Sequence, residues 1–291
     1  MAKREIDPVT GVSTTGHEWD GIRELNNPLP RWWLWVFYLT IIWSIGYWIV
    51  YPSWPLVSTY TQGVLGWNSR TAVADDLAAL RTKRAAMADR IAAASLDEVI
   101  ADPQMLDFAR AQGRAAFADN CAPCHGAGGG GAKGYPNLND DDWLWGGKLA
   151  EIEQTIRHGV RWSADENSRQ GSMPAFGRDK LLSQPDILAV AEFTRSLSGL
   201  PTTAGADLAH GKKIFADNCA SCHGNAGKGN REIGAPDLTD QIWLYGPGRD
   251  TIVEAVMNGR GAAMPSWSPR LDDTTIKSLT IYVHTLGGGQ K

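Results

Sequence analysis

The chain has 291 residues, which is enough for about two domains of ordinary size. Its formal net charge is −4 and its isoelectric point is near 5.9, so the chain lacks the excess of positive charge that would attract nucleic acid. This balance excludes nucleic acid as a partner. All four cysteines lie in two copies of one five-residue pattern, which leaves none for a disulfide framework.

An uncharged stretch of twenty residues, 32–51, follows a polar segment at the N-terminus. At about 1.5 Å per residue it covers a hydrocarbon core of about 30 Å. Aromatic residues gather at both of its ends, where amphipathic rings favour the membrane interface: Trp32, Trp33, Trp35, Trp48, Tyr51 and Trp54. We therefore predict a transmembrane helix over residues 32–52, and the alternative is a buried helix of a soluble protein.

The basic residues beside this stretch predict its orientation. Arg23 and Arg31 precede it, whereas no Lys or Arg occurs between Pro52 and Ser69. The polar lead of 31 residues is too long for an ordinary cleaved signal peptide. We expect residues 1–31 to be cytoplasmic and residues 53–291, with both haem domains, to be periplasmic, in a single-pass protein of the bacterial inner (cytoplasmic) membrane.

A linker is expected after the span, over residues 53–104. Within it, residues 71–101 are rich in Ala, Arg and Asp. Leu77, Leu80, Met87 and Ile91 recur there at near-helical spacing. This pattern predicts a solvated spacer helix on the periplasmic side.

The remainder of the chain is a duplication. FADNCAPCHG at 117–126 returns as FADNCASCHG at 215–224, and a Met-Pro pair and an apolar closing segment follow in both copies. Each copy predicts a helix, the Cys motif, a loop, a short helix, a Met-Pro loop and a closing helix. Gly199, Pro201 and Gly205 mark the break, so we predict one domain over 105–200 and another over 201–291.

The five-residue pattern is Cys-x-x-Cys-His, the signature of covalent c-type haem attachment. Its two thiols can add across the two vinyl groups of one haem, and the adjacent imidazole then reaches the iron. A zinc site, a redox dithiol and a periplasmic disulfide are the alternatives. Zinc would require the two Cys pairs to lie close together, and a dithiol would not explain the repeated His. Two covalently bound haem c groups are therefore expected.

The Met-Pro pairs supply candidates for the sixth iron ligand. Met173 and Met264 are each followed by Pro, one in each copy. Thioether sulfur favours ferrous iron, and a His/Met pair raises the reduction potential. We predict an all-α protein with one N-terminal transmembrane helix followed by two tandem class I cytochrome c domains. The candidate haem-binding residues are Cys121, Cys124, His125, Met173, Cys219, Cys222, His223 and Met264, of which the two His and two Met are the axial ligands.

The segment HEWDGIRELNNPLPRWW, at 17–33, adds a more specific signal. With the span and two c-type motifs behind it, the whole chain resembles the dihaem cytochrome c subunit (subunit III, CcoP/FixP type) of cbb3-type cytochrome c oxidases. The resemblance implies an electron-entry subunit. Electrons would come from a periplasmic cytochrome c donor and pass to a monohaem cytochrome c subunit and then to the haem–copper catalytic subunit.

The resemblance also implies how the ligands are paired. It gives one haem Cys121, Cys124, His125 and Met173, and the other Cys219, Cys222, His223 and Met264. No catalytic residue is expected, because two six-coordinate irons leave no open position for a substrate. The isolated chain would then be an electron carrier and not an enzyme.

Two other functions stay open from the residues alone. The chain could be the cytochrome subunit of a periplasmic dehydrogenase, or a dihaem peroxidase with a labile iron ligand. Asp140, Asp141 and Asp142 form the densest acidic cluster. It could steer a basic electron donor or simply be a solvated loop.

Overall fold

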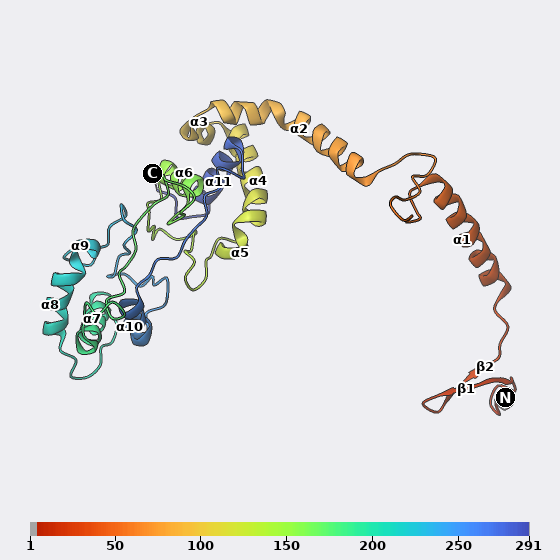
Figure 1. The fold of residues 1–291 in the computed structure, drawn as a ribbon, viewed down its shortest axis with the longest axis horizontal. Helices are drawn as coiled ribbons and strands as arrows, with labels where there is room; N and C mark the ends of the chain where they lie inside the picture. Colours follow the sequence, from red (N-terminus) through yellow and green to blue (C-terminus); the bar gives the residue numbers. More distant parts are fainter. Residues whose placement is uncertain (1–4, 291) are drawn as a thin grey trace. The chain divides into compact units, whose positions relative to one another are not determined.

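A computed structural model describes residues 5–290 (Figure 1). The chain forms two compact parts, which divide between Lys83 and Arg84. The N-terminal part begins with an antiparallel hairpin of β1 (Thr14–Trp19) and β2 (Ile22–Leu25). Its turn is Asp20-Gly21, and both residues have positive φ, as an Asp-Gly hairpin turn requires. The all-α prediction missed this hairpin.

Helix α1 (Arg31–Val50) coincides with the predicted span. Pro30 precedes it in an extended conformation, with φ −59° and ψ 135°, so the proline ends the lead-in and the helix starts at the next residue. None of its residues is buried within the structure. Among residues 5–290 it is the one helix long and apolar enough to cross a membrane.

The predicted spacer is two helices and not one. Helix α2 (Ser69–Ala93) is almost fully solvated and buries only Ile91, whereas α3 (Leu96–Ala101) starts at a new cap. The Ser95 side chain accepts a hydrogen bond from the Glu98 N–H, and the Glu98 carboxylate accepts one from the Ser95 N–H. This capping box ends the first helix and begins the second.

The two repeats contain the helices that the sequence predicts, in the predicted order. The first repeat comprises α4 (Pro103–Asn120), α5 (Ala122–His125), α6 (Leu149–His158) and α7 (Gln184–Leu197). The second comprises α8 (Leu208–Asn218), α9 (Ala220–His223), α10 (Arg249–Asn258) and α11 (Asp273–His284).

The closing helices are exchanged between the repeats. Helix α11 packs on α4 and α6 of the first repeat, and α7 packs on α8 and α10 of the second (Figure 1). A Cβ on Gly113 of α4 would collide with the carbonyl oxygen of Ser278, and one on Gly211 of α8 with that of Ala189. Glycine at each crossing therefore lets the exchanged helix approach closely.

Each hydrophobic core consequently draws on both repeats. Core A consists of Phe117, Ile152, Ile156, Ile276, Leu279 and Val283. Core B consists of Phe176, Ile187, Val190, Phe215, Cys219 and Val256. The two cores are built alike. Core A lies between α4, α6 and α11, and core B lies between α8, α10 and α7, so each core takes its closing helix from the other repeat.

The exchange occurs where two segments of chain cross. Val160 and Met264 form one antiparallel bridge, with N–H···O distances of 3.0 and 2.9 Å, and Met173 and Arg260 form another, at 2.8 and 3.2 Å. Residues 173–260 thus build core B as one continuous segment inserted in the chain that builds core A. The segments 105–200 and 201–291 remain sequence repeats, but neither packs as a separate domain.

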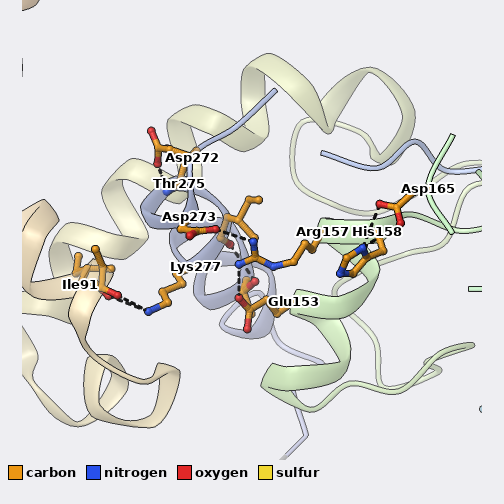
Figure 2. A network of polar contacts seen from close by, with 12 residues as sticks. Ile91, Glu153, Arg157, His158, Asp165, Asp272, Asp273, Thr275 and Lys277 are labelled. Atoms are coloured by element: carbon orange, nitrogen blue, oxygen red, sulfur yellow. Dashed lines mark hydrogen bonds and ion pairs between the residues drawn. The ribbon is translucent and has the colours of Figure 1, made fainter. Parts of the chain in front are cut away.

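Polar contacts also attach α11 to α6 of the first repeat and to the C-terminal end of α2 (Figure 2). Arg157 of α6 donates to Glu153, at 2.8 Å, and to Asp273 of α11, at 2.6 Å. The Lys277 ammonium donates to the carbonyl oxygens of Ile91, Ala92 and Ala94, at 3.2, 2.8 and 2.6 Å. A cation at these carbonyls caps the C-terminal end of α2.

The exchanged packing predicts which aromatic pairs are coupled. The rings of Phe117 and Tyr282 lie 5.4 Å apart, as do those of Phe193 and Phe215. In double-mutant cycles with Leu substitutions, Phe117 should couple to Tyr282 by about 0.5–1.5 kcal/mol and to Phe193 by almost nothing. Denaturant unfolding of the single and double variants measures both couplings. Coupling of Phe117 to Phe193 would contradict the exchange.

Candidate haem sites

Both Cys motifs sit on a single helical turn that follows a longer helix. Helix α4 ends where the Cys121 N–H donates to Phe117 O at 2.8 Å, and the N–H groups of Cys124 and His125 then donate to Cys121 O at 3.1 and 2.9 Å. In the second motif the equivalent three distances are 2.8, 3.1 and 2.9 Å. One turn separates the two thiols, and the imidazole follows at the end of the same turn.

A backbone carbonyl fixes each motif histidine. His125 Nδ1 lies 3.0 Å from Pro136 O, and His223 Nδ1 lies 3.1 Å from Pro236 O. Because a carbonyl only accepts, Nδ1 carries the proton and Nε2 keeps a free lone pair for iron. Burial lowers the pKa of both imidazoles, which favours the neutral form that ligates metal. The two prolines match at an offset of 100 residues, and this was the signal in the sequence for their role.

The second motif opens on a cavity of about 930 Å³. Cys219, Cys222 and His223 line it, and so does Met173 from the first repeat. Met173 also packs against core B, which contains Cys219. A largely apolar cavity of this size, with two thiols, an imidazole and a thioether on its walls, fits a covalently attached haem.

The first motif belongs to core A. Cys121 packs against that core, together with Trp267 from the second repeat. The Trp267 N–H donates to Ile156 O at 3.2 Å, and Met264, three residues before it, is paired with Val160 at the end of α6. The chain that carries Met264 therefore runs along the unit that holds the first motif.

The pairing implied by the sequence resemblance is thus exchanged in the structure. Met173 was expected with Cys121 and His125, and it lies in the cavity of Cys219 and His223 instead. The crossing at residues 160–173 and 260–264 explains this, because each Met-Pro loop leaves its own repeat before the methionine is reached.

A shared zinc site is inconsistent with this arrangement. The two Cys pairs lie in different cores, with Cys121 beside core A and Cys219 within core B. Within residues 5–290, no three side chains of His, Cys, Asp or Glu come together as a metal-binding group.

Comparison with known proteins identifies the family. A model of the N-terminal domain of cytochrome oxidase-cbb3, FixP, matches residues 11–58, and a model of cbb3-type cytochrome c oxidase subunit III matches 108–193 and 206–283. The chain belongs to the FixP/CcoP family of cbb3-type cytochrome c oxidase subunits. The sequence resemblance is confirmed.

Relatives align over almost the whole length. FixP of Azorhizobium caulinodans is 61% identical, over 98% of this chain and 96% of its own, and FixP of Bradyrhizobium sp. strain ORS 278 is 57% identical, over 98% of each. CcoP of Azospirillum brasilense is 49% identical over the full length of both chains.

Membership of the FixP/CcoP family confirms three predictions. The chain is mostly helical with tandem cytochrome c domains in its sequence, it carries two covalently bound haem c groups, and it is a subunit of the oxidase complex. The apolar helix α1 fits the membrane anchor of such a subunit.

The acidic cluster of this FixP/CcoP chain is turned partly inward. Asp140 and Asp142 line the cavity of the second motif together with Asp237. Burial, with the nearby charges of Asp240 and Asp140, raises the pKa of Asp142 to about 6. The sequence shows the cluster of Asp140, Asp141 and Asp142. It does not show that Asp240 of the second repeat lies near Asp142, because that contact forms only when the chain folds.

The raised pKa predicts a pH-dependent effect of Asp142→Asn. The folded-state pKa exceeds the unfolded value, so Asp142 favours the folded state only while protonated, and this contribution is lost as the pH rises through 6. The melting temperature of the variant should exceed that of the wild type at pH 8 and match it near pH 4. Asp141→Asn, at an exposed neighbour, is the control. An Asp142→Asn effect that is equal at both pH values would contradict the assignment.

Proposed function

We propose that this chain is the electron-entry subunit of its oxidase. It would accept electrons from a periplasmic cytochrome c and deliver them, through a monohaem subunit, toward the haem–copper subunit that reduces oxygen. The observations that support this proposal are two Cys-x-x-Cys-His turns, each with an imidazole fixed by a backbone carbonyl, and a methionine, Met173, that lines the cavity of the second motif. Such sites suit one-electron transfer, since bound haem supplies that chemistry without a further substrate site.

The axial ligands that we assign follow the exchanged packing. The haem held by Cys121 and Cys124 would take His125 and Met264. The haem held by Cys219 and Cys222 would take His223 and Met173. The cavity that contains Met173 beside the second motif supports this assignment, as does the position of Met264 next to the end of α6.

The surrounding residues have two tasks in this proposal. Pro136 and Pro236 hold the imidazoles in one tautomer, and the two cores keep water from the ligand bonds. A fixed ligand set changes little between the oxidised and reduced states, which favours fast electron transfer. With both axial positions filled, neither iron could bind peroxide, so a carrier is favoured over a dihaem peroxidase. The chain alone would not be an enzyme.

The membrane orientation is also part of the proposal. Residues 1–31 would be cytoplasmic, and residues 53–291 would carry both haems into the periplasm. Arg23 before α1 and Arg31 at its first residue support this orientation, as does the uncharged stretch that follows the helix. A periplasmic dehydrogenase would use a similar carrier, but the match of residues 11–58 to the FixP N-terminal domain favours the oxidase.

Purification from membranes in mild detergent tests the complex. We expect two covalent c haems in this chain, together with a copper-containing partner that carries haem b and consumes oxygen when supplied with reduced cytochrome c. Loss of one haem in Cys124→Ser or Cys222→Ser should slow this oxygen consumption while the partner's own spectrum is retained. Recovery of a dehydrogenase in place of the oxygen-consuming partner would refute the proposed function.

The ligand assignment is tested in chains that hold a single haem. With Cys219→Ser and Cys222→Ser, the haem at Cys121 remains, and Met264→His should lower its reduction potential and remove its thioether-to-iron absorption band, whereas Met173→His should change neither. The reciprocal background, Cys121→Ser with Cys124→Ser, should respond to Met173→His alone. A response to the methionine of the same repeat would contradict the exchange.

A further inference from the structure

Residues 52–68, which join α1 to α2, contain no charged residue, and we call them the post-span loop. Together with α1 they continue an uncharged stretch over 32–69, which is much longer than a bilayer span requires. The first charge after the span is Arg70, in the first turn of α2. The loop therefore lacks the charged side chains that usually face water on a protein surface.

Backbone hydrogen bonds hold the post-span loop against the C-terminal end of α1. The N–H groups of Val64 and Leu65 donate to the carbonyl oxygens of Ile49 and Val50, at 2.9 and 3.1 Å. These carbonyls belong to the last turn of the helix, which leaves them without partners inside the helix. A Cβ on Gly63, which has φ +72°, would collide with Val50 O, so glycine permits the close approach. The loop is thus fixed to the end of the span.

The outer half of the post-span loop makes hydrogen bonds with itself. The Leu56 N–H donates to Thr59 O at 2.7 Å, and the Thr61 N–H donates to Trp54 O at 3.0 Å. The Thr61 hydroxyl accepts a further bond from the Trp54 N–H, at 3.0 Å. Because these backbone groups already have partners, moving the turn out of bulk water costs less free energy.

The aliphatic side chains of the post-span loop are exposed and do not form a core. Val57 is fully exposed and Val64 is 79% exposed, and Leu56 and Leu65 are each more than half exposed. Exposed apolar side chains gathered in this way mark a surface that contacts a partner or a membrane.

Aromatic contacts join the post-span loop to the aromatic end of α1. The rings of Trp54 and Trp48 lie 5.0 Å apart, and those of Trp67 and Tyr51 lie 6.2 Å apart. Tryptophan and tyrosine favour the layer between hydrocarbon and water. The aromatic belt at this end of the span therefore extends into the loop.

We propose that the post-span loop lies in the lipid interface of the periplasmic leaflet, where Leu56, Val57, Val64 and Leu65 bury their side chains. This inference rests on the membrane anchor and the orientation given under the proposed function. Lipid is favoured over a protein partner as the cover, because the loop is fixed to a helix end that itself lies in the bilayer. Insertion fixes the depth of α1 and the point at which α2 enters the periplasm.

The absence of charge determines which lipid the loop requires. Its affinity comes from buried apolar area and not from attraction to anionic headgroups. Insertion should therefore occur in zwitterionic phospholipid and should not change with salt concentration.

Fluorescent labelling of the full-length, haem-loaded subunit in nanodiscs of zwitterionic phospholipid tests this proposal. The four native cysteines are attached to haem, so an introduced cysteine provides the free thiol. Labels at Val57→Cys and Leu65→Cys should lose most of their fluorescence to a lipid-borne quencher placed near the headgroups, and iodide in the water should quench them little. A quencher at the ends of the acyl chains should affect them less, and salt should change neither result.

Two matched labels serve as controls. A label at Asp76→Cys, an exposed position of the solvated helix α2, should be quenched by iodide and not by the lipid-borne quenchers. A label at Ile42→Cys, near the middle of α1, should be quenched most by the quencher at the ends of the acyl chains.

Three outcomes would count against the inference. Lipid quenching of the Val57 label no stronger than that of the Asp76 label, with the Ile42 label quenched as expected, would overturn it. Protection of the Val57 label that appears only in the complete oxidase would also overturn it and would assign the loop to a protein partner. An Ile42 label that iodide quenches freely would refute the membrane anchor of the proposed function, and the inference with it.

Discussion

Two short backbone pairings, Val160 with Met264 and Met173 with Arg260, determine how the haem-binding part is built. Where these segments cross, each Met-Pro loop passes to the unit of the other motif. The closing helices must follow, so α11 completes core A and α7 completes core B. The glycines of α4 and α8 then receive the exchanged helices at close range. The positions of both methionines and of the chain ends follow from this one crossing.

The crossing makes the two haem units unequal although their sequences repeat. Core B forms from a continuous segment, whereas core A closes only when α11 returns from the far end of the chain, a contact with a larger loop-closure entropy. In the C-terminal segment after α11, Gly288 O also accepts a hydrogen bond from the indole N–H of Trp143, whereas the indole N–H of Trp243 is buried without a partner among the described residues. Two haems in different surroundings can hold different potentials, and a difference of this kind gives direction to electron flow through a carrier.

Much of the fold and of the haem sites could be predicted from residue patterns in the sequence. The charge-free stretch predicted α1, the Cys-x-x-Cys-His motifs predicted both haem attachments, and the spacing of apolar residues predicted the closing helices. The exchange of the closing helices could not be predicted from the sequence, because α7 and α11 carry equivalent apolar faces and either helix would fit either core. The approach of Asp240 to Asp142 depends on that packing too. The break between α2 and α3 could have been found, since Ser95 and Glu98 have the spacing of a capping box.

Cleavage of the linker between α7 and α8 tests the central claim, that each haem unit contains chain from both repeats. A specific protease site is introduced within residues 201–206 of the haem-loaded subunit, the linker is cut, and the products are separated under native conditions. In the exchanged structure the cut falls inside the unit of core B, and the two fragments remain together until both cores unfold. Two separately folded, haem-bearing domains of 105–200 and 201–291 after cleavage would contradict the exchange.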